Sequence, residues 1–241
     1  MLVSTQGFVI QTTPHAETSV IVRIFTSQLG LRSYIMKGVR SHSSRQKQNL
    51  LAPFTLLDLV VYDTPRSSLN YVKDISVTSA QPPLPSDIVV NSLRFFFAEV
   101  LLRTLPEGEP LPGLFEYLVG LHGQLLKPKV DSSLPLLFLL SHANHLGIAP
   151  LNNYSIHQPL FSLSDGSFVA PYVTPDTLTP HLSLLLHHYQ LSITDSSMPV
   201  PTAPLAERRE LIDALLLYFQ FHFSTFKDFQ SHQILHAVLS E

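Results

Sequence analysis

The 241-residue sequence contains no cysteine, which excludes disulfides, thiolate zinc sites and cysteine nucleophiles. Glycine is scarce as well, with nine residues, and neither a Gly-x-x-x-x-Gly-Lys-Ser/Thr loop nor a Gly-x-Gly-x-x-Gly pattern occurs. Chemistry on ATP or on dinucleotides therefore has no support in the sequence. The Gly-x-Ser-x-Gly elbow of serine hydrolases is also missing. These absences favour a protein that is not an enzyme.

Long apolar runs are lacking too. Residues 132–164 contain no Asp, Glu, Lys or Arg. Their apolar stretch at 134–140 is still far shorter than the roughly 20 residues that cross a bilayer. The N-terminus shows no basic region followed by a sustained apolar run, so we expect no signal peptide. We expect a buried helix here, in a soluble, cytoplasmic protein that does not enter a membrane.

Charged residues make up only 14% of the chain, against roughly 25% in typical soluble proteins, so their placement is informative. Residues 1–80 carry eight Lys and Arg against four Asp and Glu, whereas residues 81–241 carry seven against fourteen. This asymmetry predicts a basic N-terminal module on an acidic body. A chance distribution of a few charges is the alternative.

Residues 1–80 have the pattern of β-structure. Alternating or β-branched segments begin at Phe8, run over 19–26, 31–37 and 54–62, and end with 71–77. Turn-forming residues such as Gly30 separate them. Five short strands without helical periodicity favour a five-stranded OB-type barrel, because closing the sheet removes its edges.

The pattern changes at the prolines of residues 81–85, where we place a boundary between a domain of residues 1–80 and one of residues 81–241. Apolar residues then recur at helical spacing, first from about 86, with Ser86 as a possible N-cap and Asp87 suited to the first turn. Helices are also expected from 111, 134, 179, 205 and 231. A hairpin-like insertion near 151–172 turns about Asp165 and Gly166. The fold class is therefore α+β, a barrel followed by a mainly α-helical domain.

Twelve histidines raise the possibility of a metal-dependent hydrolase. His142 and His145 are three residues apart, and His181, His187 and His188 cluster. The His-Glu-x-x-His pattern of helical zinc sites is absent, and His142 and His145 have no acidic neighbour. Structural or exposed histidines are the favoured interpretation, and the hydrolase is a minor alternative.

Cationic side chains with aromatic ones between them suggest nucleic-acid binding in the barrel, since cations neutralise phosphates and rings stack on bases. The candidate residues are Arg32, Tyr34, Lys37, Arg40, Arg45, Lys47, Arg66 and Lys73, with Tyr71 and Phe54 interleaved. Tyr34 could instead be a core residue. The group from Lys37 to Lys47 could be an ordinary solvated loop, and Arg23 is better explained as a surface cation.

The chain resembles the RecO family through an ordered set of short segments that spans nearly its whole length. They are Gly7-Phe8-Val9-Ile10, Glu17-Thr18-Ser19-Val20-Ile21-Val22 with Phe25-Thr26 and Gly30, Lys37-Gly38-Val39-Arg40, Leu51-Ala52-Pro53-Phe54, Leu146-Gly147 with Pro150, Phe161-Ser162-Leu163 with Gly166 and Phe168, Leu211 with Tyr218 and His222, and Ser231 with Ile234 and Leu235. Each segment is weak by itself, and their order is fairly specific.

The resemblance implies an OB-fold followed by a helical domain, and a DNA-repair mediator in the bacterial cytoplasm, associated with the nucleoid. RecO-like proteins bind single- and double-stranded DNA, anneal strands and, with RecR, help to load RecA onto DNA coated by single-stranded DNA-binding protein. The Lys-Gly-x-Arg match implies DNA contact at Lys37 and Arg40, and we expect close backbone approach at Gly38. The acidic tail of single-stranded DNA-binding protein would dock beside a basic residue of the helical domain: Arg94, Arg103, Lys127 or Lys129.

One departure concerns a four-cysteine zinc module that many members carry after the Gly-x-x-Pro segment. This chain has no cysteine there, so we expect no zinc or other cofactor, and a hairpin held by packing alone. A protein-docking scaffold that has lost DNA affinity is the main alternative function.

Overall fold

The computed structural model describes residues 1–39, 49–64, 67–78, 82–195, 197–226 and 229–238. Its contacts divide the chain into two compact units, residues 1–130 and residues 131–241. The predicted boundary near residue 80 instead separates the barrel from the helices. That boundary stays a prediction.

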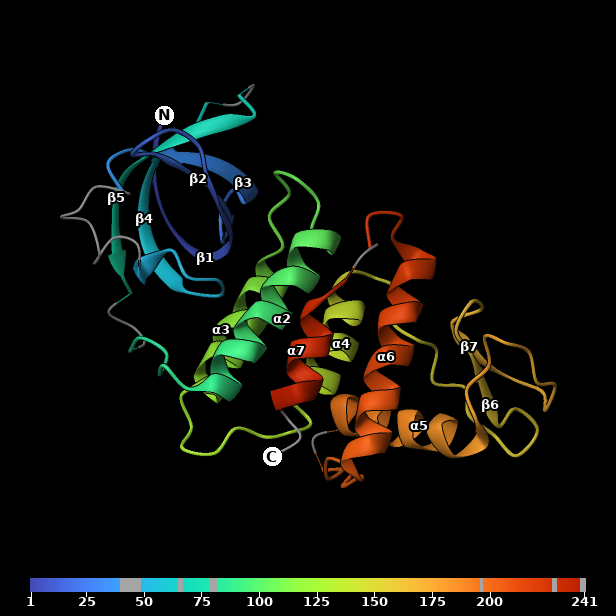
Figure 1. Cartoon of the computed structure of the whole chain (residues 1–241). Coiled ribbons are helices and arrows are strands. Elements are labelled where there is room, and N and C mark those ends of the chain that lie inside the picture. Colours follow the sequence, from blue (N-terminus) through green and yellow to red (C-terminus); the bar gives the residue numbers. More distant parts are fainter. Residues whose placement is uncertain (40–48, 65–66, 79–81, 196, 227–228, 239–241) are drawn as a thin grey trace. The chain divides into compact units, whose positions relative to one another are not determined.

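Five strands form the closed barrel of the first unit, in the order β1-β2-β3-β5-β4 (Figure 1). They are β1 (Leu2–Pro14), β2 (Val20–Thr26), β3 (Gly30–Met36), β4 (Leu56–Tyr62) and β5 (Leu69–Val77). Strand β1 pairs antiparallel with both β2 and β4, while β3 and β5 pair in parallel and complete the closure. The predicted five-stranded OB-type barrel is confirmed.

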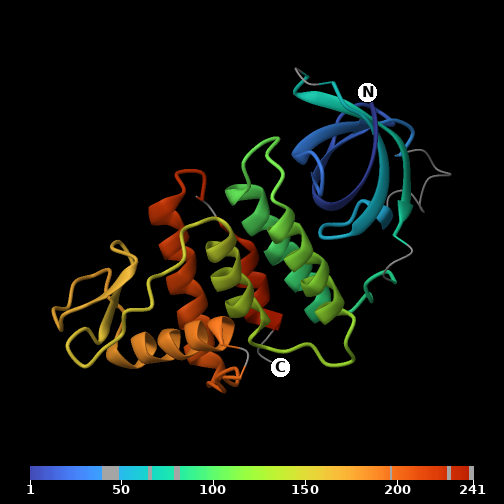
Figure 2. The same ribbon diagram turned by 180° about the vertical axis from the view of Figure 1, so that it is seen from behind.

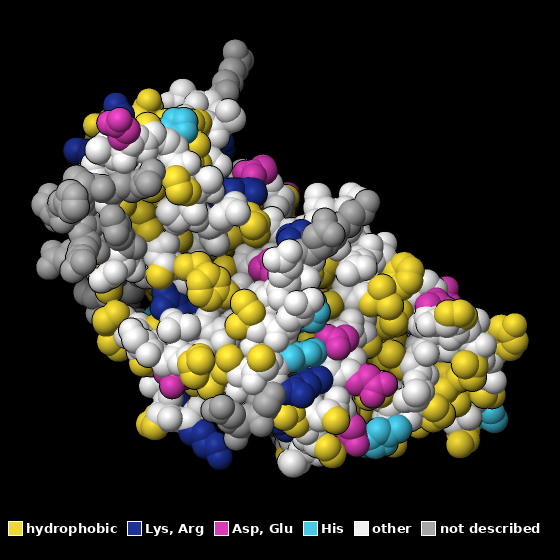
Figure 3. All heavy atoms as spheres, in the orientation of Figure 1, with side chains coloured by type: hydrophobic (Ala, Val, Ile, Leu, Met, Phe, Trp, Pro, Cys, Tyr) yellow, Lys and Arg dark blue, Asp and Glu magenta, His cyan; other side chains and the backbone are white. Residues whose placement is uncertain are grey.

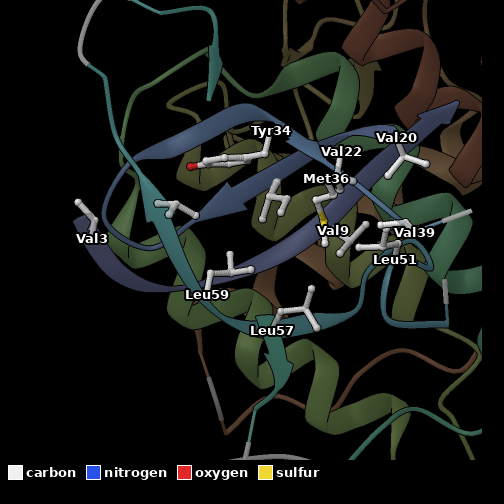
Figure 4. Packing of buried hydrophobic residues seen from close by; sticks show 12 residues of the cluster. Val3, Val9, Val20, Val22, Tyr34, Met36, Val39, Leu51, Leu57 and Leu59 are labelled. Atoms are coloured by element: carbon white, nitrogen blue, oxygen red, sulfur yellow. The ribbon is translucent and has the colours of Figure 1, made fainter. Parts of the chain in front are cut away.

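The barrel interior is filled by apolar side chains at alternating positions of the strands. Figure 4 shows this cluster, in which Val9, Val22 and Tyr34 point inward together with Leu57 and Leu59 of β4. Complete burial of such side chains contributes roughly 1.5–3 kcal/mol each to stability. The same alternation leaves every second side chain on the outer face of the barrel.

Two helices complete the first unit, α2 (Ile88–Thr104) and α3 (Pro112–Leu125), which run side by side in both views (Figures 1 and 2). Asp87 caps α2, because its carboxylate accepts hydrogen bonds from the backbone N–H groups of Val89 and Val90, at 2.8 and 3.1 Å. The expectation that Ser86 is the cap is therefore wrong by one residue. Aromatic contacts join the helices to the barrel: the ring centroid of Phe8 lies 5.5 Å from that of Phe115 in α3, and that of Phe54 lies 5.3 Å from that of Phe97 in α2.

Gly30 and Gly38 both adopt left-handed backbone angles, which favour glycine. A Cβ at Gly30 would lie 2.3 Å from the backbone oxygen of Glu109, so close approach requires glycine in this turn. At Gly38, by contrast, no heavy atom of the described residues lies within 4 Å of where a Cβ would be. The positive φ suits glycine at this position, and the expected close approach of the Gly38 backbone to DNA stays a prediction.

The second unit contains four helices among the described residues, and a small hairpin. These are α4 (Leu134–His145), α5 (Pro180–Thr194), α6 (Leu205–His222) and α7 (Ser231–Val238), with the antiparallel strands β6 (Leu160–Ser162) and β7 (Ser167–Val169). The helical starts predicted from 134, 179, 205 and 231 agree with these bounds to within about one residue. Across the described parts of the chain, no helix combines the length and apolar character needed to span a membrane.

Candidate nucleic-acid interface

The outer face of the barrel carries a groove where the end of β3 meets β5 and β4. Its volume is about 420 Å³. Ten residues line it: Ile35, Met36, Lys37, Leu50, Tyr62, Tyr71, Val72, Lys73, Asp74 and Ile75. The groove therefore combines two lysines and two tyrosines with one carboxylate and an apolar floor.

Strand pairing explains why these side chains meet. Ile35 and Tyr71 are partners in the parallel β3–β5 pair, and Lys37 follows two residues after Ile35, just past the end of β3. The ammonium nitrogen of Lys37 lies over the ring of Tyr71, 5.6 Å from its centroid. Such cation–π contacts are worth about 0.5–1 kcal/mol at exposed sites. Lys37 is exposed, so the contact leaves its charge accessible to solvent.

A β-bulge places Lys73. Val72 pairs with Val61 of β4 and Asp74 pairs with Val60, so Lys73 is the extra residue on β5. Bulges interrupt the alternation of a strand and turn a side chain in a new direction. As a result, Lys73 and Asp74 are both exposed although they are neighbours in the sequence.

The structure brings two of the predicted DNA-binding residues, Lys37 and Lys73, to one groove. Arg32 is half-buried and lies elsewhere, with its Nε donating to the Leu29 carbonyl at 3.4 Å. Its guanidinium lies against Gly108 in the loop between α2 and α3. Four further candidates, Arg40, Arg45, Lys47 and Arg66, fall outside the described residues.

Tyr34 is not part of this surface. Its side chain is 1% exposed and points into the barrel (Figure 4), and burial raises its pKa to about 12. A ring in this position is not accessible to a base, so we correct the prediction of DNA contact and assign Tyr34 to the core. Phe54 is likewise fully buried. Arg23 forms an ion pair with Glu107, as expected of a surface cation.

Sequence reasoning missed Tyr62 as a site residue. It is the last residue of β4, lies directly opposite Tyr71 on β5 and is 46% exposed, while Tyr71 is 47% exposed. The only signal in the sequence was its place at the outward end of an alternating strand. Its meeting with Tyr71 depends on strand register, which the sequence does not show directly.

The four candidate docking cations differ in their surroundings. Arg94 is half-buried and donates to the Pro53 carbonyl at 2.9 Å and to Thr55 Oγ1 at 2.8 Å. Burial lowers its pKa. Arg94 also lines a cavity of about 440 Å³ whose apolar wall includes Leu56 and the segment 82–84.

The other three candidates lie away from that cavity's lining. Arg103 pairs with Glu99 one helical turn earlier in α2, with Nη2 2.8 Å from Oε1. Lys127 and Lys129 are exposed in the segment between α3 and α4. All four remain predicted docking residues, and Arg94 has the surroundings that best fit an apolar ligand with an acidic group.

The histidines serve packing and pairing. His142 is fully buried and stacks between Phe138 and Phe219, with ring centroids 5.4 and 6.0 Å away, and burial lowers its pKa to about 3. His181 Nε2 lies 2.8 Å from Glu207 Oε2. Within the described ranges, no group of three or more His, Cys, Asp or Glu residues could hold a metal. The metal-dependent hydrolase therefore gains no support from these ranges.

The hairpin near 151–172 is held by more than packing. Asn153 Oδ1 accepts from the Phe168 backbone N–H at 2.8 Å, and Asn153 Nδ2 donates to the Phe168 carbonyl at 2.9 Å. Rings of Tyr154 and His187 stack at 4.6 Å beside it. The expectation of packing alone was wrong, because a side-chain amide mimics a neighbouring strand for β7.

Comparisons with known proteins give consistent results over the whole chain. Residues 1–81 match the family model described as recombination protein O N terminal, and residues 85–157 match recombination protein O C terminal. The boundary between these matches falls close to the predicted boundary at residue 80.

Curated relatives are similar over their full length. Proteins named DNA repair protein RecO from Flavobacterium psychrophilum and Flavobacterium johnsoniae are 25% and 27% identical, each over 100% of both chains. The protein of the same name from Christiangramia forsetii is 26% identical over 99% of both chains.

Proposed function

Because this chain belongs to the RecO family of non-enzymatic DNA-repair and recombination mediators, we propose that its barrel binds single- and double-stranded DNA without sequence preference. The observation that carries this proposal is the groove in which Lys37 and Lys73 lie beside two exposed tyrosines. Lysine ammonium groups bind phosphates, which every nucleotide shares, and tyrosine rings stack on any base. The chemistry of the groove thus favours binding that depends little on sequence.

A salt titration of DNA affinity tests this proposal. Each phosphate contact contributes a slope of about −0.7 to the plot of log affinity against log salt for single strands, and about −0.9 for duplex. The double variant Lys37→Glu with Lys73→Glu is expected to lose at least about tenfold in affinity for both DNA forms, with a single-strand slope reduced by about 1.4.

Lys127→Glu is the matched control, since Lys127 is also exposed but lies outside the groove. It should retain wild-type affinity. If wild-type protein binds neither DNA form, or if the double variant binds as well as wild type, the barrel does not work in this way and the docking-scaffold alternative is favoured.

Family membership further supports roles that involve other proteins. We propose that the protein anneals complementary strands in the bacterial cytoplasm and, with RecR, helps RecA to load onto DNA coated by single-stranded DNA-binding protein. The two-domain division at residue 80 belongs to this proposal, with the barrel holding DNA and the region behind it docking partners.

The cavity beside Arg94 is the proposed docking place for the acidic, apolar-ended tail of single-stranded DNA-binding protein. Ser86 lines this cavity and is exposed, so Ser86→Asp adds a negative charge without removing any hydrogen bond of Arg94. Affinity for a tail peptide, measured by fluorescence anisotropy, should fall about fivefold, because one repulsive charge near the surface costs roughly 1 kcal/mol. Loss of binding in Lys127→Glu with Lys129→Glu, but not in Ser86→Asp, would move the docking place to the α3–α4 segment.

A further inference from the structure

The paired tyrosines of the groove have a property that the lysines lack. Tyr62 and Tyr71 are direct cross-strand partners at the ends of β4 and β5, so their Cβ atoms are about 5 Å apart, as opposite residues are. Both rings are nearly half exposed. Two adjacent aromatic side chains left open on a barrel face form a platform rather than part of a core.

We propose that Tyr62 and Tyr71 form a base-stacking subsite that is selective for single-stranded DNA, while Lys37 and Lys73 bind phosphates of either DNA form. This inference rests on the proposed DNA binding of the barrel. The faces of bases in a duplex are already stacked on one another, so only an unpaired base can lie against a tyrosine ring. Phosphates are exposed in both forms, so the lysines do not discriminate between them.

The location of the pair supports this assignment. Tyr62 ends β4 and Tyr71 is the third residue of β5, so both stand at the base of the connection between these strands. In OB-type barrels this connection is one of the two loops through which oligonucleotides bind. The bulge at Lys73 turns a cation toward the same groove, two residues from Tyr71.

Lys37 occupies the stacking face of Tyr71 when no DNA is bound. Its ammonium group lies over the Tyr71 ring, where an incoming base would stack. Because this contact is weak and exposed, a base can take the place of the ammonium group, which then reaches a phosphate with its three donors. The same lysine therefore covers the ring in the free protein and binds the backbone of the strand in the complex.

The test compares single-stranded oligothymidylate with duplex DNA of equal length, using Tyr62→Leu, Tyr71→Leu and the double variant. Leucine keeps apolar bulk on the strand and removes the aromatic face. Single-strand affinity should fall about tenfold for each variant and further for the double variant, from the usual worth of base–aromatic stacking. Duplex affinity should change less than about twofold, and the salt slope should stay constant because no phosphate contact is lost.

Two controls separate stacking from folding. Tyr62→Phe and Tyr71→Phe keep the ring and should bind single strands within about twofold of wild type. Tyr172, which is 75% exposed in the second unit, provides an exposed tyrosine outside the groove, and Tyr172→Leu should have no effect. Thermal unfolding of every variant shows whether a loss of affinity follows from a loss of structure.

Fluorescence gives an independent measurement, because the sequence contains no tryptophan. Tyr71→Trp introduces a single reporter, whose emission should be quenched by a stacked base on adding oligothymidylate and not on adding duplex.

The outcomes distinguish the two proposals. If wild-type protein binds no DNA, the proposed function fails, and the subsite fails with it. If wild type binds both forms but the leucine variants weaken both equally, or weaken neither, DNA binding by the barrel stands and the tyrosine subsite is overturned.

Discussion

Ionisable side chains are used in opposite ways in the groove of the barrel and in the second unit. In the groove, Lys37 and Lys73 are exposed, and neither forms an ion pair within the part of the chain that the structure describes. In the second unit, His181 pairs with Glu207, and His236 lies 3.5 Å from Asp213. Charge in the groove is left available for binding, whereas charge in the second unit is used for internal contacts.

This difference matters because charge is scarce. On the face shown in Figure 3, dark blue and magenta side chains are few and scattered among yellow and white ones. In a chain with 14% charged residues, two exposed lysines beside two open rings are a notable concentration of binding chemistry. The comparison teaches that substitutions in the groove should change binding without changing stability, and that substitutions in the second unit should do the reverse.

Acid should produce the largest effect, and it should destabilise both units, the second more than the first. Burial lowers the pKa of His142, His145, His187 and His236 there, whereas in the first unit it lowers the histidine pKa at His122, to about 4. A histidine with a lowered folded pKa binds protons more readily when unfolded, so stability is full above about pH 6.5 and falls as pH decreases below it. At pH 5 the loss is about 2 kcal/mol for His142, with a pKa of about 3, and nearly the same for His122, with a pKa of about 4. The lowered pKa values of His145, His187 and His236 add to the loss in the second unit.

Amide hydrogen exchange at pH 7.5 and pH 5, corrected for intrinsic rates, measures this loss unit by unit. His142→Leu removes the titrating ring. The slope of the second unit's unfolding free energy against pH should then fall by the equivalent of about one proton taken up on unfolding. If acid lowered the stability of both units equally, or if the stability of His142→Leu depended on pH as that of wild type does, the expected difference between the two units would be wrong.

The second largest effect on stability is expected in the hairpin of β6 and β7. Asn153→Ala removes two hydrogen bonds to the backbone of Phe168, each worth about 1 kcal/mol, so opening of the hairpin should become easier by roughly 2 kcal/mol. Asn153→Asp keeps the accepting oxygen and loses the donor, so about half of the effect should remain.

Hydrogen exchange of the hairpin amides reports the change in both Asn153 variants. DNA affinity of both should equal that of wild type, since the groove lies in the other unit. A variant that loses DNA affinity while its hairpin stays protected would show that the second unit takes part in DNA binding.

The barrel was predictable because its strands carry period-two patterns separated by turn residues. The location of Lys37 at the end of β3 follows from the same pattern. Alternation shows which residues share a face but does not always show which face is inside. On β3, Leu31 and Tyr34 are both buried although they lie on opposite faces of the strand. The pattern of aromatic residues among cations therefore could not show whether Tyr34 faces the core or the solvent.

The rest of the candidate site depends on register and irregularity. The pairing of Tyr62 with Tyr71 joins residues nine positions apart in the sequence, and the extra residue at Lys73 follows no local sequence rule. Asp87 and Ser86 are both good N-cap residues, and the choice between them was set by where the first turn of α2 begins. Tertiary contacts therefore decide what local patterns leave open.

Asp74 provides the smallest and most discriminating test of the comparison. It is the one carboxylate among the described residues that line the groove, next to Lys73 in sequence, and it repels the phosphates that the lysines attract. Asp74→Asn should raise affinity for both DNA forms about two- to threefold at low salt, and the gain should vanish near 0.5 M salt, where exposed charges are screened within about 4 Å. Thermal stability should stay the same, because the Asp74 side chain is exposed and asparagine can also accept the hydrogen bond that the Ile75 backbone N–H donates to Asp74 at 3.0 Å. Asp165→Asn makes the same charge change at an exposed position of the second unit and should leave DNA affinity as it is. An equal gain in both variants would mean that net charge, rather than the groove, sets the affinity, and the contrast between the two regions would then lose its functional meaning.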